Sequence, residues 1–166
     1  VASFREQVRT FLVPLCQKLY DAQAKRLGLD HVMVYDEKMV FPDGNAEPAG
    51  DDAFMVKTAQ KMYHEISPET GEFIDFMIDH ELMDLQNKPG KASTGYMTYL
   101  PSLKAPFVFS CFNHTIFDMQ VLTHELGHAF AGYMAMRSQP IFDYYSESTD
   151  IAEIHSMSME QFAYPY

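Results

Sequence analysis

The sequence predicts a mainly α-helical chain that carries one small β-hairpin or sheet. Apolar residues recur at helical spacing in several long stretches, helix-capping residues precede those stretches, and only one region holds two short β-like runs. Apolar residues make up 47% of the 166-residue chain, which is enough to build one core. Because no linker-like segment separates the helical stretches, we expect a single domain over residues 1–166.

The first helix is expected over residues 2–28. Pro14 must kink it, because proline lacks a backbone N–H and clashes with the preceding turn. Gly28 is suited to end it. The prolines, glycines and acidic residues of segment 41–52 then predict a loop.

Two helices are expected next, over about 52–66 and 68–86, each with a capping residue in front. An aspartate (Asp51 or Asp52) can cap the first of them, and Ser67 can cap the second. Each of the two helices therefore has a defined first residue. The expected end of the second helix, near residue 86, rests on the helical spacing of its apolar residues.

Two β-like runs follow, at residues 96–100 and 107–112. Prolines bracket the short connection between them, so we expect a hairpin. A long helix over 116–137 comes next, introduced by a Thr-x-x-Asp capping box. A short connection then leads to a last helix at about 149–163.

Charge and cysteine content exclude several classes of function. The net charge of −11 has the wrong sign for a nucleic-acid partner and gives no attraction to anionic membranes. No apolar run approaches the roughly 20 residues of a membrane-spanning helix. Cys16 and Cys111 show no paired spacing, so we expect reduced thiols and a cytoplasmic protein.

The functional signal is the run His124-Glu125-Leu126-Gly127-His128 within the long helix. Residues four apart on a helix share a face, so both imidazoles can reach one metal ion. Glu125 lies near the same side and can contact a water on that ion. This arrangement is typical of hydrolytic zinc sites, with Glu125 as the general base.

A hydrolytic zinc ion usually takes three protein ligands and one water. Position 134 is Met, so the third histidine of the longer His-rich motif is missing. Glu153 on the last helix is the leading candidate, since the short connection lets that helix pack antiparallel to the long helix over 116–137. Asp150 and Glu160 share its face, and either could accept a hydrogen bond from a ligand imidazole. Such a set of two histidines and a glutamate also binds manganese or cobalt.

These residues together resemble the thimet oligopeptidase and oligoendopeptidase F family of zinc metallopeptidases, a gluzincin family. The pattern that carries the resemblance is the His124–Ala129 motif followed by Glu153. Four segments resemble the oligoendopeptidase F branch in particular: FPDGN at 41–45, KMYHE at 61–65, SPET at 67–70 and EIHSMSME at 153–160.

The resemblance implies a zinc-dependent endopeptidase that cleaves internal bonds of short oligopeptides with one zinc ion. It implies a helical, zincin-type catalytic core with the small sheet beside the active-site cleft. In that family an edge strand pairs with the peptide backbone, which corresponds here to residues 95–100 or 107–113. Candidate substrate contacts are Gly95, Tyr96, Met97 and His155.

Family members are several times longer than this chain. They supply a tyrosine and a histidine, after the glutamate-bearing helix, that stabilise the oxyanion, and Tyr164 and Tyr166 are not expected to replace them. We therefore expect a partial catalytic domain that needs the remainder of the full-length peptidase. Because losing one oxyanion donor costs about 10²–10³ in rate, weak activity is expected for the chain alone.

Two alternatives remain open. A carboxypeptidase-type gluzincin would need a pocket for a free carboxylate, usually with arginine, and Arg137 is the only arginine near the motif. A zinc-stabilised peptide-binding module without catalysis would not need a general base, which Glu125 supplies.

Overall fold

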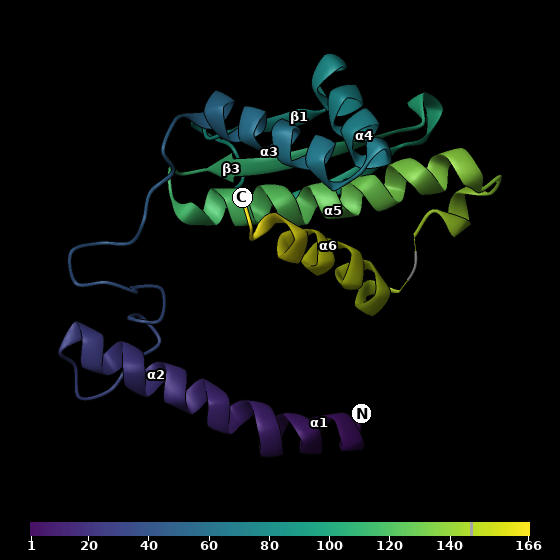
Figure 1. The fold of residues 1–166 in the computed structure, drawn as a ribbon. Helices are drawn as coiled ribbons and strands as arrows, with labels where there is room; N and C mark the ends of the chain where they lie inside the picture. Colours follow the sequence, from purple (N-terminus) through teal and green to yellow (C-terminus); the bar gives the residue numbers. More distant parts are fainter. Residues whose placement is uncertain (147) are drawn as a thin grey trace. The chain divides into compact units, whose positions relative to one another are not determined.

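The computed structural model describes residues 1–146 and 148–166 (Figure 1). Contacts divide the chain into two units, Val1–Ala46 and Glu47–Tyr166. The sequence predicted one domain without a boundary. The division falls within the segment rich in proline and glycine that was predicted to be a loop, and the candidate site residues all belong to the second unit.

The first unit is built on a helical stretch in three parts. α1 (Ala2–Gln7) and α2 (Val13–Leu27) flank a π-helical turn, η1 (Val8–Leu12). Pro14 stands in the first turn of α2, directly after this π-helical turn. The predicted kink thus takes the form of a widened turn. Gly28 ends α2 with φ 70°, as predicted from its tolerance of the left-handed region.

The second unit begins with two helices that pack against each other, α3 (Asp52–Ile66) and α4 (Pro68–Asp79). The Asp51 side chain accepts a hydrogen bond from the Phe54 amide at 2.9 Å, and Ser67 forms a capping box with Thr70. Both predicted helix starts are confirmed, because each cap satisfies amides that the first turn cannot.

The predicted end of α4 near residue 86 is wrong. The helix stops at Asp79, Glu81 adopts a left-handed φ of 53°, and Met83–Gln86 form strand β1. β1 pairs with a strand more than twenty positions further along the chain, since Met83 lies opposite Val108. The local sequence around residues 83–86 therefore does not reveal this pairing. Tertiary pairing overrides local preference here.

The sheet has three strands in the order β1-β3-β2, with β2 (Tyr96–Leu100) and β3 (Ala105–Phe112) as the other two. β2 and β3 are antiparallel neighbours, which confirms the predicted hairpin, whereas β1 lies parallel to β3. β2 is therefore an edge strand of this sheet.

Two long helices complete the unit, α5 (Ile116–Ser138) and α6 (Thr149–Ala163). α5 packs along β2 and β3, and α6 runs beside α5 in the opposite direction (Figure 1). The predicted capping box of Thr115 and Asp118 is present at the start of α5. Buried side chains from α3, α4, β3 and α5 form one core, including Met55, Phe73, Val108, Leu122 and Leu126. The predicted mainly α fold with a small sheet is confirmed.

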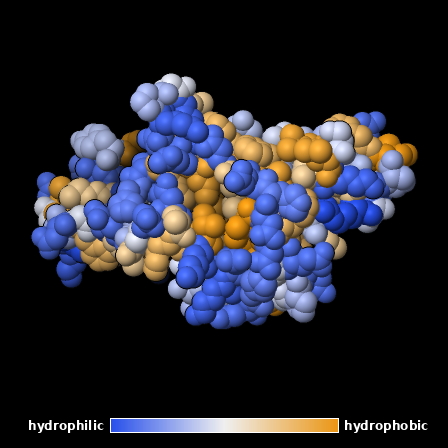
Figure 2. Space-filling view, turned by 90° about the horizontal axis from the view of Figure 1, so that it is seen from above, coloured by the Kyte–Doolittle hydropathy of each residue, from blue (hydrophilic) through white to orange (hydrophobic). Residues whose placement is uncertain are grey.

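The surface of the second unit combines polar helix faces with apolar patches. Figure 2 shows hydrophobic surface near the middle of the face seen from above, framed by hydrophilic surface. A hollow between α3 and β1 is lined by Val56, Met77, Met83 and Leu85. None of the described helices is both long enough and apolar enough to cross a membrane.

Candidate metal centre

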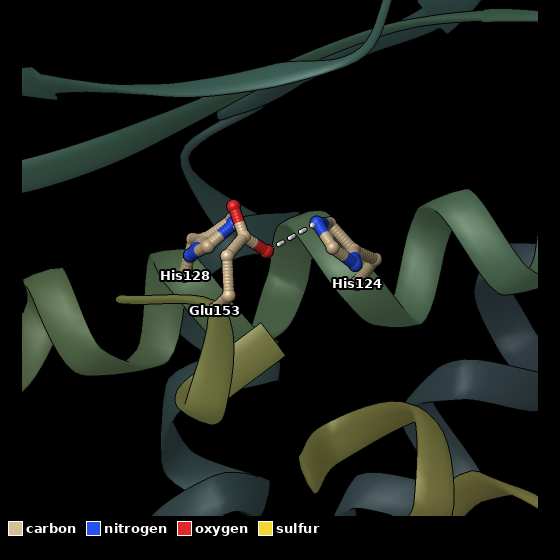
Figure 3. Close-up of side chains that lie close together, drawn as sticks. All are labelled: His124, His128 and Glu153. Carbon is tan, nitrogen blue, oxygen red and sulfur yellow. Dashed lines mark ion pairs between the residues drawn. The ribbon is translucent and has the colours of Figure 1, made fainter. Parts of the chain in front are cut away.

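Helix α5 places His124 and His128 one turn apart on the face that meets α6. Their ring centroids lie 4.9 Å apart with the rings nearly perpendicular, at 85°. Because α6 runs antiparallel to α5, its second turn brings Glu153 opposite the two rings (Figure 3). The local helix thus pairs the imidazoles, and the packing of α6 adds the carboxylate.

The three side chains converge on one point. Glu153 Oε2 lies 3.4 Å from His124 Nε2 and 3.7 Å from His128 Nε2, and the ligand atoms of the group all lie within 4.8 Å of one another. Zinc ligands about 2.0–2.1 Å from a tetrahedral ion stand roughly 3.4 Å apart. This donor set of two nitrogens and one oxygen therefore fits a zinc ion without rearrangement of the backbone.

The second nitrogen of His124 is held by a carboxylate. His124 Nδ1 lies 2.6 Å from Glu160 Oε1, and Gln120 donates to Glu160 Oε2 at 3.0 Å. A carboxylate can only accept, so Nδ1 carries the proton and Nε2 presents its lone pair to the metal position. Among the described residues, Asp150 forms no hydrogen bond or ion pair with either imidazole.

Glu125 is 7% exposed, and its carboxylate lies beside Gly95, the residue before β2. A Cβ added to Gly95 would stand 3.1 Å from Glu125 Oε1, so the two residues are in close contact. Burial raises the pKa of Glu125; the charge of His124 opposes that shift and the charge of Glu153 adds to it. Burial shifts the pKa of His128 in the opposite direction, downward, because it again disfavours the charged form. The lower pKa favours the neutral imidazole that a metal requires.

Comparison with known protein families places this geometry in context. Residues 51–166, which include every candidate site residue, match the family model described as peptidase family M3. The chain belongs to peptidase family M3. The resemblance that the motifs indicated is thereby confirmed.

Solved structures similar to this M3 chain carry the names of peptidases. PZ peptidase A with an inhibitor is 50% identical, with 99% of this chain and 29% of that chain covered and a TM-score of 0.93. A structure from Bacillus anthracis assigned as an oligoendopeptidase F is 46% identical over 99% of this chain and 30% of its own, also with a TM-score of 0.93. The M3 chain thus spans about 29% of the length of such relatives. No curated protein matches it.

A pocket of about 400 Å³ opens beside the metal position of this M3 chain. Helix α5, helix α6 and the start of β2 form its walls. Of the site residues predicted from the sequence, all but Asp150 and Glu160 line it: Gly95, Tyr96, Met97, His124, Glu125, His128, Glu153 and His155. The four predicted substrate contacts therefore share one cavity with the metal position.

Two further residues, Ser156 and Gln120, contact residues of this centre and were not predicted from the sequence. Ser156, which has no exposed surface, places its hydroxyl 2.8 Å from Glu153 Oε2. Gln120 holds Glu160, as described above. Both signals were present in the sequence, since Gln120 stands four residues before His124 and Ser156 three residues after Glu153, spacings that bring helical side chains together. The sequence did not show which side chains Gln120 and Ser156 contact, and the structure does.

Proposed function

We propose that this M3 chain carries the metal-binding part of a zinc-dependent endopeptidase that cleaves internal bonds of short oligopeptides. The observation that supports this proposal is the convergence of His124, His128 and Glu153 on one point, with the Glu125 carboxylate beside it. A structural zinc site closes its coordination sphere with four protein ligands. Here three ligands face a pocket, which leaves a position for water.

The reaction follows from the placement of these groups. When bound, the zinc ion would polarise the scissile carbonyl and acidify a water molecule. His124, His128 and Glu153 hold the ion, and Glu160 keeps His124 in the tautomer that can bind it. Glu125 accepts the proton of the attacking water and donates it to the amine of the departing peptide. General acid–base catalysis of this kind contributes about 10²–10⁴-fold in rate.

The position of β2 at one edge of the sheet supports a peptide substrate. Gly95 and Tyr96 stand where the pocket meets that edge. An extended peptide can add a strand to such an edge through main-chain hydrogen bonds, which give affinity with little dependence on side chains. We propose that oligopeptides bind there with the scissile bond over the metal position.

We further propose that groups outside this chain complete the oxyanion site. The chain corresponds to about 29% of the length of its solved relatives. The described part of the pocket supplies a metal position and a base. It offers no arginine or lysine to a developing negative charge, since the residues that line it include neither.

Replacing Glu125 with glutamine in the full-length protein tests the proposal. Zinc content should stay at the wild-type level, while cleavage of a C-terminally amidated peptide at an internal bond falls by about 10²–10⁴-fold. Glu65→Gln, at an exposed position on α3, is the matched control and should leave both unchanged. Full activity of Glu125→Gln would exclude this residue as the base. Release of single C-terminal residues, with no cleavage of the amidated peptide, would favour a carboxypeptidase.

A further inference from the structure

Ser156 lies at the centre of the contact between α5 and α6. Its side chain has no exposed surface, and its Oγ stands 2.8 Å from Glu153 Oε2 and 3.1 Å from the Glu153 carbonyl oxygen. A serine hydroxyl has a single hydrogen to donate. The carboxylate oxygen is both nearer and charged, so it is the stronger of the two acceptors.

The oxygen that accepts from Ser156 is also the one that faces the imidazoles. Glu153 Oε2 is the atom 3.4 Å from His124 Nε2 and 3.7 Å from His128 Nε2. A carboxylate oxygen has two lone pairs, so one can accept the serine hydrogen while the other points to the metal position. The hydroxyl therefore fixes the orientation of this oxygen.

The Glu153 side chain is less restricted by its surroundings than the two histidines, so a hydrogen bond that fixes its orientation matters more. Its side chain is 39% exposed, against 28% for His124 and 15% for His128. A partly exposed glutamate samples several rotamers, and binding a metal in one of them costs conformational entropy. His124 is already oriented by Glu160. Within the described residues, Ser156 is the one group that donates a hydrogen bond to the Glu153 carboxylate.

The position of Ser156 is itself fixed by the backbone. A Cβ on Gly127 would lie 2.8 Å from the Ser156 Cα, so the two helices meet there without an intervening side chain. The hydroxyl is consequently shielded from water.

We propose that Ser156 is a positioning residue that holds the Glu153 carboxylate in the orientation that binds the metal. The inference rests on the proposed function, because it requires Glu153 to be a metal ligand. A different role is common for helical serines, in which the hydroxyl bonds only to the backbone carbonyl three residues earlier. That role predicts no effect on the metal.

Zinc affinity of the metal-free full-length protein, measured by competition with a chromophoric chelator, separates these roles. Ser156→Ala should weaken zinc binding by about 10–100-fold, the usual effect of removing a group that orients a ligand. Ser158→Ala is the matched control, because Ser158 lies on the exposed side of the same helix, and it should bind zinc as the wild type does. The absorption spectrum of the cobalt-substituted protein should change for Ser156→Ala alone.

A double-mutant cycle excludes a general effect on folding. In a Glu153→Ala background, Ser156→Ala should cause no further loss of zinc affinity, because its partner is gone. An equal loss in both backgrounds, or wild-type affinity of Ser156→Ala, would overturn the inference. Wild-type affinity of Glu153→Ala itself would instead overturn the ligand assignment in the proposed function, so the two failures are distinguishable.

Discussion

Gly127 and Ser156 face each other where α5 and α6 meet, and a Cβ on residue 127 would stand 2.8 Å from the Ser156 Cα and 2.9 Å from the His155 carbonyl oxygen. The glycine between Glu125 and His128 therefore has a packing role. It lets α6 approach closely enough for Glu153 to reach the histidines.

Gly127→Ala should move α6 away from α5, because the new methyl group would clash with backbone atoms that cannot turn aside. Overpacking of this kind costs about 1–3 kcal/mol of unfolding free energy. We expect a lower melting temperature and weaker zinc binding, measured by thermal unfolding and zinc titration. The matched control is Gly71→Ala on α4, where the nearest atoms belong to the half-exposed His64 side chain rather than to a backbone, and zinc affinity should stay at the wild-type level. Wild-type zinc affinity of Gly127→Ala would contradict this account of the packing.

Glu160 and Asp150 were equal candidates from the sequence for holding a ligand imidazole, and the structure separates them. Glu160 lies 2.6 Å from His124 Nδ1, whereas Asp150 is exposed and has no such contact among the described residues. Glu160→Gln should weaken zinc binding about 10–100-fold. Asp150→Asn, a matched loss of one carboxylate on the same helix, should leave the dissociation constant unchanged. Chelator competition gives both values, and the reverse order would refute the assignment.

Zinc should stabilise the folded protein through its ligands. A ligand at 100 times its dissociation constant adds about 2.7 kcal/mol to the free energy of unfolding if it binds only the native state. We expect zinc to raise the melting temperature of the wild type and a chelator to reverse the rise. Glu153→Ala should show a much smaller rise, since one of three ligands is missing. An equal rise in both proteins would place the stabilising ion elsewhere.

Gly95 keeps space open beside the proposed base. A Cβ at this position would lie 3.1 Å from Glu125 Oε1 and 3.0 Å from Val121 Cγ1. Gly95→Ala should therefore displace the Glu125 carboxylate and lower kcat, while zinc affinity stays at the wild-type level because the three ligands are untouched. Gly71→Ala on α4, where the nearest atoms belong to the half-exposed His64 side chain, controls for the loss of a glycine away from the pocket. Unchanged kcat in Gly95→Ala would contradict the prediction.

Lys91 fixes the loop that follows β1. Its side chain is 3% exposed, donates to the carbonyl oxygens of Asp84 and Gln86 at 2.9 and 2.8 Å, and lies 3.0 Å from the Asp84 carboxylate. Lys91→Met removes the hydrogen bonds to two backbone carbonyls and the buried half of the ion pair, so we expect a loss of about 1–3 kcal/mol in urea unfolding. The matched control Lys88→Met removes an exposed lysine that pairs only with the same carboxylate, and should cost less than about 1 kcal/mol.

The same contact gives a pH dependence. The hydrogen bond from Lys91 holds the pKa of Asp84 below its usual value. Stability from a lowered acid pKa is present above the unfolded-state value and is lost as the pH falls through the folded-state value. The stability difference between wild type and Lys91→Met should therefore narrow in acid. If the difference in unfolding free energy stays constant as the pH falls through the folded-state pKa of Asp84, the ionised Asp84 carboxylate does not contribute to the stabilisation by Lys91.

Much of the fold was accessible from the sequence because the signals are local. The caps at Asp51, Ser67 and Thr115 lie within one turn of the amides they satisfy, and each marks a true helix start. The relation between His124 and His128 is also local, since a single helical turn fixes it. The identity of Glu153 as a candidate ligand came from spacing and family resemblance.

Tertiary structure decided what depends on contacts between distant segments. β1 formed where a helix was predicted, because its partner Val108 is far along the chain. The hydrogen bond of Glu160 with His124 depends on how α6 lies on α5. The hydrogen bond of Ser156 with Glu153 is local to α6, but the same packing decides that it stands opposite the histidines. By itself, the sequence determined which side chains stand on each face of a helix. Only the packing of α6 on α5, with its close approach at Gly127, decided which of those faces meet. This contact joins the backbones of two segments that are distant in the sequence, so no local sequence pattern predicts it.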